Sequence, residues 1–504
     1  MIRLTFFSLL LLILGSCHSN VKDMENMDIQ EVPTPLQQKD FTELTTSAEL
    51  KQYLEHLDTL HEFMVLEEIG TSVQGKPILL TKVAKNGVTA GNRLNVLLFA
   101  QQHGNEPSGK EGLLMLLRHL AENNNHQLLD KLNLFIIPQL NPDGGDMDQR
   151  RNANDVDLNR DHLLISSPEV QAVQQLFKQY AHEVTVDIHE YYPFGESWEE
   201  FGYRRDFDIQ LGGLTNLNVD SRIRTFFDNM ALPYVQQRVQ DSSYSFFEYT
   251  LGHFPSGERL RHSTVDVNDG RQSFGILNTL SFIVEGMNGR SAIDNIERRA
   301  KSQFITALSL VQLAYDSEPK IRQMVTRSRE QLTTSSPGTD VAIRMEHVQG
   351  EEPLQYSLLS LSTGEDTVFT VEKYHSRVMA TLSVKKPEGY LIPTGDKKLV
   401  DWLKRSQIEY YDYHPFEKHR IMQYKILSHR KSVDEELENF YPEVEKVEVK
   451  RPINENEYYY VSTKQLYSNK LVTALEPQAM YGLINYPEFN YLLDKEFFPI
   501  LRHE

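Results

Sequence analysis

The sequence is poor in cysteine, because its 504 residues contain one, Cys17. A single cysteine cannot form a disulfide within the chain, so packing and hydrogen bonds must hold the fold. Hydrophobic residues make up 40% of the chain, charged residues 24%, and the mean hydropathy is -0.46. This composition is typical of a soluble globular protein with a sizeable core, and the length corresponds to roughly two to four domains.

Long hydrophobic runs are also missing. The apolar run from Leu9 to Leu14, which follows Arg3, is too short to span a bilayer as a helix and predicts a signal peptide at residues 1–16. The run ends in Leu14-Gly15-Ser16-Cys17, and a cysteine directly after small residues resembles the bacterial lipoprotein processing signal. This resemblance implies that Cys17 is lipidated; the alternative is an ordinary signal peptide that contains a cysteine.

A lipid on Cys17 would anchor the protein in a bacterial cell envelope, in the periplasm or at the outer membrane. Residues 17–45 are polar and acidic and include Pro33 and Pro35. We expect them to form a flexible tether without fixed structure between the lipid and the folded body.

Positive charge is in short supply. The 52 Lys and Arg residues face 71 Asp and Glu residues, for a formal net charge of -19. Such a chain is not expected to bind nucleic acid or anionic lipid headgroups through its overall charge. Contact with a membrane would therefore come from the lipid on Cys17.

Strand-like and helix-like segments alternate in the first two thirds of the chain. Continuous apolar runs predict buried strands at 94–100, 132–137, 184–188 and 280–284, and apolar residues at helical spacing predict helices at 109–120, 169–180 and 293–315. This alternation predicts an α/β fold: a mixed, largely parallel sheet with helices on both faces.

The pattern changes after about residue 317. A Ser/Thr/Gly-rich stretch is followed by short segments in which apolar and polar residues alternate, most clearly at 368–371, 378–384 and 458–461, with one predicted helix at 396–406. We therefore predict a first folded domain at 46–320, a linker at 321–340 and a smaller β-rich C-terminal domain at 341–504.

Three residues near the ends of predicted strands have the side chains that hold catalytic zinc. Such sites usually have three ligands drawn from His, Asp and Glu and leave a fourth position for water. His103 and Glu106 share a loop after the strand at 94–100, and His189 follows the strand at 184–188. The carboxyl ends of strands form the ligand crevice of open α/β sheets. Alone, the His-x-x-Glu pair is weak evidence, and an isolated histidine after a strand is more often a core residue.

The order of five motifs is more specific. They are Gln102-His103-Gly104-Asn105-Glu106-Pro107, Asn141-Pro142-Asp143-Gly144, Val156-Asp157-Leu158-Asn159-Arg160-Asp161, Asp187-Ile188-His189 and Phe282-Ile283-Val284-Glu285. In this order they resemble the zinc carboxypeptidase family of the carboxypeptidase A type, over about residues 50–315. The chain is similar to bacterial lipoprotein members of the family that carry a β-rich C-terminal extension.

The resemblance implies a role for each matching residue. His103, Glu106 and His189 match the metal ligands, so we expect one zinc ion per chain. Glu285 matches the glutamate that activates the metal-bound water and passes its proton to the leaving amine. Asp157 matches a residue that orients the first histidine ligand.

One asparagine position and two arginine positions also match residues of the family. Asn159 and Arg160 match the pair that binds the free C-terminal carboxylate of the substrate, for which a guanidinium is well suited. Either Arg150 or Arg151 matches the arginine that stabilises charge on the carbonyl oxygen, and counting from the following Asn152 favours Arg150.

One feature of the family is absent. Its members often carry a tyrosine about two dozen residues before the catalytic glutamate, but that window contains none here, and Tyr244 and Tyr249 lie too far upstream by count. The surrounding loop, 252–275, mixes charges of both signs that we expect to face solvent. They are Arg259, Arg261, Arg271, Glu258, Asp266 and Asp269.

The sequence therefore predicts a zinc metallocarboxypeptidase that hydrolyses C-terminal bonds of peptides or of peptidoglycan stem peptides. Two alternatives stay open. One keeps the zinc site but makes the protein a deacylase of small N-acyl amino acids, for which the missing tyrosine leaves room. The other is a lipoprotein whose peptidase domain is inactive and whose β-rich region binds a surface glycan or protein.

Overall fold

The computed structural model describes residues 32–87, 93–122, 127–252, 259–334, 338–415, 420–434 and 437–504. Cys17 and the predicted signal peptide at 1–16 lie outside these residues. Within the described ranges, no helix combines the length and apolar character needed to cross a membrane.

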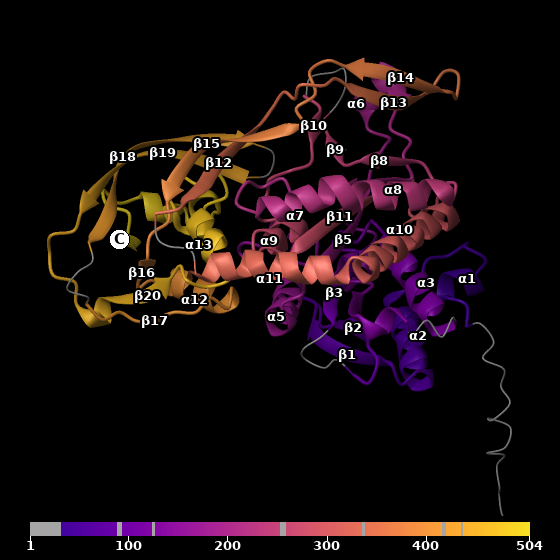
Figure 1. Cartoon of the computed structure of the whole chain (residues 1–504), viewed down its shortest axis with the longest axis horizontal. Helices are drawn as coiled ribbons and strands as arrows, with labels where there is room; N and C mark the ends of the chain where they lie inside the picture. Colours follow the sequence, from indigo (N-terminus) through magenta and orange to yellow (C-terminus); the bar gives the residue numbers. More distant parts are fainter. Residues whose placement is uncertain are drawn as a thin grey trace, which may run out of the picture.

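An eight-stranded mixed sheet forms the centre of the N-terminal region, residues 32–334 (Figure 1). In spatial order the strands are β1 (Met64–Thr71), β2 (Pro77–Val83), β4 (Leu132–Ile137), β3 (Leu94–Ala100), β5 (Val184–Tyr191), β11 (Leu280–Met287), β7 (Ile209–Gly212) and β8 (Phe246–Glu248). The four central strands, β4, β3, β5 and β11, are mutually parallel. β1 and β2 pair antiparallel with their neighbours, β7 pairs antiparallel with β11, and β8 pairs parallel with β7. The predicted mixed, largely parallel sheet is confirmed.

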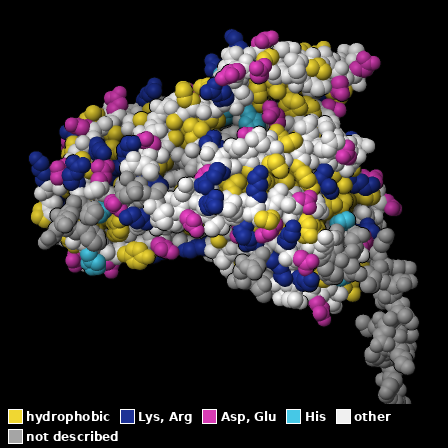
Figure 2. Space-filling view, in the orientation of Figure 1, with side chains coloured by type: hydrophobic (Ala, Val, Ile, Leu, Met, Phe, Trp, Pro, Cys, Tyr) yellow, Lys and Arg dark blue, Asp and Glu magenta, His cyan; other side chains and the backbone are white. Residues whose placement is uncertain are grey.

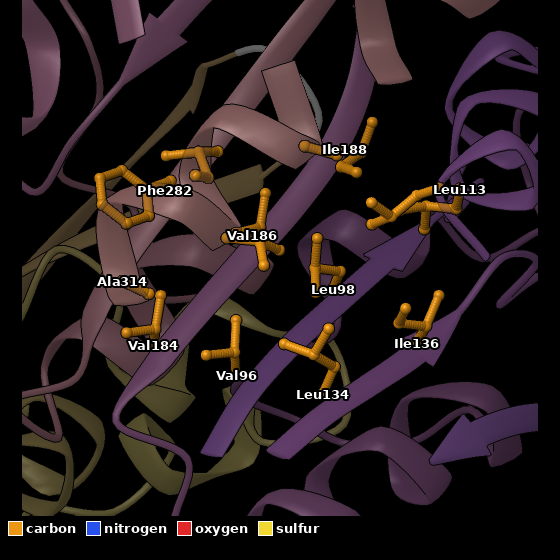
Figure 3. Packing of buried hydrophobic residues seen from close by; sticks show 14 of the residues in the cluster. Val96, Leu98, Leu113, Leu134, Ile136, Val184, Val186, Ile188, Phe282 and Ala314 are labelled. Atoms are coloured by element: carbon orange, nitrogen blue, oxygen red, sulfur yellow. The ribbon is translucent and has the colours of Figure 1, made fainter. Parts of the chain in front are cut away.

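Both faces of this sheet are buried, because successive side chains of a strand point to opposite sides. On β3, Val96 and Leu98 belong to one apolar cluster, and Leu97 and Phe99 to another. The helices that supply the first cluster are α2 (Ser47–Leu60), α3 (Ser108–Glu122), α7 (Ser221–Phe226), α8 (Leu232–Asp241), α10 (Ile296–Asp316) and α11 (Glu318–Thr334). Figure 3 shows Val96 and Leu98 beside Val186 of β5 and Leu113 of α3 in this cluster.

The second face is covered partly by the C-terminal region, residues 338–504. Helices α5 (Pro168–Tyr180) and α9 (Gly270–Gly275) contribute to this cluster, and so does α12 (Lys397–Arg405). Trp402 of α12 is 1% exposed, and its Nε1 donates a hydrogen bond to the carbonyl of Leu163 at 2.9 Å. The two regions therefore share one hydrophobic core.

The C-terminal region is β-rich, as predicted, and contains the predicted helix, α12. Its strands are β12 (Asp340–Val348), β13 (Leu354–Ser360), β14 (Asp366–Val371), β15 (Arg377–Lys385), β16 (Gly389–Pro393), β17 (Tyr411–Asp412), β18 (Ile421–Asp434), β19 (Leu437–Glu448), β20 (Tyr458–Ser462) and β21 (Leu501–His503). They form a β12-β15 pair, a sheet ordered β17-β20-β16-β21-β18-β19, and the β14-β13 pair that continues into β6 (Tyr203–Arg204) of the N-terminal region. Figure 1 shows β13 and β14 beside α6 (Glu196–Phe201), away from the rest of the C-terminal region.

The boundary between the regions differs from the prediction. The expected linker at 321–340 is largely the helix α11, which buries Ile321, Met324 and Val325. These residues recur at helical spacing, so the helix gains a buried face that a solvated linker would lack. Most of the range predicted as a linker is thus a packed helix, and residues 335–337 lie outside the described residues.

The expected tether at 17–45 also differs where it is described. Residues 35–38 form α1 (Pro35–Gln38), and Leu36 is fully buried against Met115 and Ile296. Thr45 donates hydrogen bonds from its amide and its hydroxyl to the Glu111 carboxylate, at 2.9 and 2.7 Å. The segment from residue 32 onward is therefore part of the folded body.

Several short elements complete the chain. They are α4 (Pro142–Met147), α13 (Ser468–Leu475), β9 (Thr250–Leu251), β10 (Arg261–His262), the π-helical turn η3 (Phe227–Ala231), and the 3-10 turns η1 (Leu128–Asp130), η2 (Leu158–Arg160), η4 (Glu455–Glu457), η5 (Leu483–Asn485) and η6 (Asn490–Leu493).

Candidate metal centre

Three buried side chains converge at the carboxyl ends of the neighbouring parallel strands β3 and β5. His103 and Glu106 lie in the loop between β3 and α3, and His189 lies on β5. His103 Nδ1 is 2.8 Å from Glu106 Oε1, His189 Nδ1 is 2.9 Å from Glu106 Oε2, and the two Nδ1 atoms are 3.2 Å apart. Two imidazole nitrogens and a carboxylate facing one point form the donor set of a catalytic zinc site.

The loop that carries two of these residues is held closely by the second motif. The side-chain amide of Asn141 donates to the carbonyl of Gln102 at 3.0 Å. A Cβ atom on Gly104 would lie 2.0 Å from the carbonyl carbon of Gly144, so only glycine fits at this position. The contact explains why Gln102 to Pro107 and Asn141 to Gly144 occur together.

A carboxylate holds the outward nitrogen of each histidine. His103 Nε2 lies 3.0 Å from Asp157 Oδ1, and His189 Nε2 lies 2.8 Å from Asp187 Oδ1. The Gln102 side chain donates to the two Asp187 oxygens at 2.8 and 3.0 Å. Carboxylate partners of this kind fix the ring orientation of zinc-binding histidines, so the residues present fit a zinc ion.

The charges around the centre are arranged for a cation. Burial by itself would raise the pKa of Glu106, but the charges and hydrogen bonds of His103 and His189 outweigh it and hold that pKa below its ordinary value. Burial also works to raise the pKa of Asp157, and His103 again reverses the direction. Both carboxylates are therefore ionised at neutral pH and available to a metal ion or its histidine ligands.

Glu285 lies on β11, directly opposite His189 in the parallel pairing with β5. Its side chain is 8% exposed, and burial raises its pKa to about 7, an effect that the charge of His189 opposes and that of Glu106 reinforces. A carboxyl group with such a pKa can both accept and donate a proton near neutral pH. The strand register thus brings the predicted general base to the edge of the metal centre.

The structure separates the two candidate arginines. Arg150 Nη1 lies 3.2 Å from His103 Nδ1 and 3.5 Å from Glu106 Oε1, and its Nη2 lies 2.9 Å from Asp157 Oδ2. Arg151 instead donates to the carbonyl of Asp155 at 3.0 Å. Of the two, Arg150 is the one at the metal centre.

Asn159 and Arg160 lie on the turn η2, next to the centre. Asn159 Oδ1 accepts a hydrogen bond from the amide of Gly270 at 2.8 Å. Arg160 donates to the carbonyl of Asn159 at 3.0 Å, and within the described part of the chain no carboxylate lies within 4 Å of its guanidinium. Burial works to lower the pKa of Arg160, but the negative charges of Asp266 and Asp157 raise it, so the side chain stays charged and free to bind a carboxylate.

Two tyrosines lie near Arg160 although neither falls in the expected window. Tyr249 is buried; its pKa is raised first by burial and then by the charge of Glu285. Tyr481, from the C-terminal region, lines the same cavity as Arg160, and its hydroxyl donates to Asp266. A count along the chain could not find them, because Tyr249 approaches through sheet pairing and Tyr481 from another region.

Part of the mixed-charge loop is not solvent-exposed as expected. Arg271 is 0% exposed, lies 3.1 Å from Asp269 and donates to the hydroxyl of Ser263 at 2.6 Å. Arg259 is exposed, and Glu258 lies outside the described residues. The buried pair holds α9 against the site, which a charge count cannot reveal.

Sequence reasoning missed two polar residues of the centre, Gln102 and Asp187. Asp187 could have been found, because it lies two residues before His189 and the two side chains of a strand at that spacing share a face. Gln102 also accepts a hydrogen bond from His162 Nε2 at 2.8 Å. Lys470 of α13 donates to the carbonyl of His162 at 2.8 Å, so the C-terminal region reaches the residues that support the metal centre.

Comparison with known proteins supports the family assignment. The family model described as zinc carboxypeptidase matches residues 50–165. The chain is 27% identical to carboxypeptidase 2 of Trichophyton rubrum over 304 residues, which cover 58% of this chain and 56% of that protein. It is 36% identical to carboxypeptidase E of Caenorhabditis elegans over 119 residues, 20% of this chain and 25% of that protein. The chain thus spans little more than half of the Trichophyton relative.

Solved structures with similar parts are also carboxypeptidases. A metallo-carboxypeptidase from Pseudomonas aeruginosa, solved with (2-guanidinoethylmercapto)succinic acid, is 22% identical with a TM-score of 0.42, over 56% of this chain and 71% of that one. Carboxypeptidase A from Helicoverpa armigera is 15% identical with a TM-score of 0.43, over 55% of this chain and 75% of that one. The family resemblance and the zinc cofactor expected from the five motifs are confirmed by the family match together with the buried ligand group.

Proposed function

We propose that this chain, whose residues 50–165 belong to the zinc carboxypeptidase family, is a metallocarboxypeptidase that removes C-terminal residues from peptides. The observation that supports the proposal most strongly is the convergence of His103, Glu106 and His189 beside a buried Glu285. A ligand group alone would suit many zinc proteins. The neighbouring carboxylate and the uncommitted Arg160 favour hydrolysis of a substrate that carries its own carboxylate.

His103, Glu106 and His189 would hold the zinc ion. When bound, zinc acts as a Lewis acid that lowers the pKa of a water molecule and polarises the carbonyl of the bond to be cut. Asp157 and Asp187 keep the two imidazole rings in position, because each accepts a hydrogen bond from the ring nitrogen that faces away from the other ligands.

Glu285 moves the proton. Its carboxylate takes a proton from the attacking water, holds it as the carbon–oxygen bond forms, and passes it to the nitrogen of the leaving amine as the carbon–nitrogen bond breaks. Burial brings the pKa of Glu285 to about 7, so neither transfer is strongly uphill. Arg150, which contacts His103, would stabilise the negative charge that develops on the carbonyl oxygen.

Arg160 and Asn159 would select the end of the substrate. The guanidinium of Arg160 can form two parallel hydrogen bonds with a free C-terminal carboxylate, a group that an internal residue of a peptide lacks. This geometry favours an exopeptidase. Stem peptides of peptidoglycan, which also end in a carboxylate, are a second source of the same chemistry and within reach of an enzyme in the cell envelope.

The experiment that tests the proposal compares peptides with a free C-terminus and the same peptides with a C-terminal amide, using zinc-loaded protein that lacks residues 1–17. The free peptides should lose their last residue, and the amides should be almost inert. Arg160→Gln should abolish this discrimination, whereas the matched control Arg151→Gln should retain it. Protein that folds but binds no zinc, or that releases only the acyl group of small N-acyl amino acids, would contradict the proposal.

We further propose that Cys17, which lies outside the described residues, carries a lipid that anchors the enzyme in a bacterial cell envelope. The proposal rests on the sequence Leu14-Gly15-Ser16-Cys17 at the end of a short apolar run. Cys17→Ser should move the protein from the membrane fraction to the soluble fraction. An unchanged distribution would contradict lipidation.

A further inference from the structure

A large cavity lies between the metal centre and the C-terminal region. Its volume is about 1160 Å³, and its walls come from both regions: Arg150, Asp157 and Arg160 on one side, and residues of β12, β15, β18 and β19 on the other. It therefore opens directly onto the residues assigned to the substrate's carbonyl and carboxylate. No motif of the sequence pointed to the C-terminal wall.

Arginines slightly outnumber carboxylates in the lining of this cavity. Five arginines line it, Arg150, Arg160, Arg261, Arg344 and Arg430, against four carboxylates, Asp157, Asp266, Glu346 and Glu443. Over the whole chain acidic residues outnumber basic ones, and on the face shown in Figure 2 the two signs are interspersed. The balance of charge in the cavity is therefore reversed relative to the chain.

Most of these carboxylates are already engaged. Asp157 contacts His103 and Arg150. Asp266 accepts from the Tyr481 hydroxyl, and Glu443 accepts from the Ser428 hydroxyl at 2.9 Å. Glu346 is the exception, since no hydrogen bond to its side chain occurs among the described residues.

The arginines of the C-terminal wall have no such partners. The guanidinium carbons of Arg344 and Arg430 lie 4.3 and 4.9 Å from the ring centroid of Tyr441. Arg344 also donates to the carbonyl of Phe440 at 3.0 Å, but within the described ranges neither Arg344, Arg430 nor Arg261 has a carboxylate within 4 Å. Arg344 is half-buried, and its burial and the nearby charge of Arg430 both lower its pKa.

Arg344 and Arg430 both contact the ring of Tyr441 and have no carboxylate partner among the described residues, so an anion that contacts both guanidinium groups would offset their mutual repulsion. Contact with Tyr441 holds both guanidinium groups beside one ring, and the N–H groups of Arg344 and Arg430 that have no partner can donate to carboxylate oxygens. The remaining Glu346 and the engaged carboxylates would repel a continuous polyanion, so the site suits isolated carboxylates spaced along a chain.

We propose that this cavity is a substrate-recognition site for acidic peptides, in which Arg344 and Arg430 bind side-chain carboxylates of a peptide whose C-terminus is held at Arg160. The C-terminal region then contributes directly to substrate choice. This inference rests on the proposed carboxypeptidase function, since it assumes that the C-terminal carboxylate lies at Arg160.

The test compares the hydrolysis of matched peptides that end in the same residue and carry Glu or Gln at the four preceding positions, one position at a time. For the wild-type enzyme, kcat/KM should be about tenfold higher for at least one Glu peptide than for its Gln counterpart, mainly through a lower KM. High salt should reduce this ratio, because the charges are partly exposed.

Variants of the two arginines then show which residues cause the preference for Glu peptides. Arg430→Gln, at an exposed position, and Arg344→Gln should each bring the Glu-to-Gln ratio close to one. Arg377→Gln is the matched control: Arg377 lies on β15 of the same region, is 63% exposed and pairs with Glu351 outside the cavity. It should leave the ratio as in the wild type.

The outcomes distinguish this proposal from the one on which it rests. If free C-terminal peptides are cleaved but Glu and Gln peptides react equally, the acidic site is contradicted and the carboxypeptidase function stands. If no peptide of either kind is cleaved, the function itself fails. In that case, fluorescence anisotropy measures the affinity of the Glu285→Gln protein for the Glu and the Gln peptides without any hydrolysis. Equal affinities would contradict the acidic-peptide site.

Discussion

Asp187 and His189 project from the same face of β5, and Asp187 Oδ1 lies 2.8 Å from His189 Nε2. The other ring nitrogen of His189 faces Glu106 at 2.9 Å. These side chains therefore form a series of contacts. Gln102 donates a hydrogen bond to Asp187, Asp187 accepts one from Nε2 of His189, and Nδ1 of His189 faces the metal site. A spacing of two residues on a single strand is enough to orient a ligand.

Asp187→Asn should weaken zinc binding without unfolding the protein. Asparagine keeps the shape of the side chain but removes the negative charge that makes His189 a better ligand, and loss of such partners typically costs about 10 to 100-fold in metal affinity. Chelator competition measures the zinc dissociation constant. Asp220→Asn is the matched control, since Asp220 caps α7 and pairs with Arg222. Equal zinc affinity in both variants would show that Asp187 has no part in holding the ligand.

Glu285→Gln should abolish hydrolysis and leave zinc binding intact. The amide cannot accept the proton of the attacking water, and general acid–base groups contribute about 100 to 10,000-fold to the rate. Zinc content, thermal stability and peptide affinity should stay close to those of the wild type because His103, Glu106 and His189 are unchanged. A variant that retains more than a tenth of the wild-type kcat would rule out Glu285 as the general base.

His182→Phe should flatten the dependence of stability on pH. His182 is fully buried between Phe135 and Phe177, neither ring nitrogen has a hydrogen-bond partner within the described part of the chain, and burial lowers its pKa to about 3. In the unfolded chain its pKa is about 6.5. The neutral ring therefore stabilises the fold fully above about pH 6.5, and this stability is lost as the pH falls toward 3.

Between pH 7 and pH 5 the loss from His182 amounts to about 2 kcal/mol. Urea unfolding at these two pH values should show a smaller decrease in the free energy of unfolding for His182→Phe than for the wild type. The exposed His56, on α2, provides the control: His56→Phe should leave the decrease unchanged, because that side chain meets water in both states. Equal decreases in all three proteins would contradict the assignment.

Trp402→Ala should destabilise the whole chain, including the metal centre. Truncating a fully buried tryptophan typically costs about 3 to 5 kcal/mol, and Trp402 joins the C-terminal region to the N-terminal region through packing and its bond to Leu163. Val368→Ala on β14, where the side chain is 63% exposed, should cost little. If the chain unfolds in two separate transitions and Trp402→Ala shifts only the first of them, the two regions fold independently.

Local patterns predicted the parts of this protein that depend on near neighbours in the chain. The apolar runs predicted the central strands, because burial on both faces requires apolar residues at every position of a strand. The motifs around His103 and His189 predicted a zinc carboxypeptidase, because ligands at strand ends occupy fixed positions in such a sheet. The fold class, the resemblance to the zinc carboxypeptidase family over residues 50–165 and the zinc cofactor are confirmed, whereas the roles of Arg160, Glu285 and Cys17 stay predictions.

Other features followed from contacts between distant segments. The expected linker at 321–340 is mostly helix α11, and the expected tether is folded from residue 32 onward, because each finds an apolar surface to cover. Arg150 and Arg151 are identical side chains one residue apart, and only the path of the loop brings the first to the metal centre.

The sequence by itself determined which residues can hold the metal: His103 and Glu106 share one short motif, and His189 ends another. Only the tertiary structure decided what surrounds them. Glu285 lies opposite His189 through strand register, and Tyr481, Arg344 and Arg430 line the same cavity as Arg160 from the C-terminal region. Short-range spacing is encoded by the geometry of one strand or turn, whereas contacts across hundreds of residues depend on how the complete hydrophobic core packs.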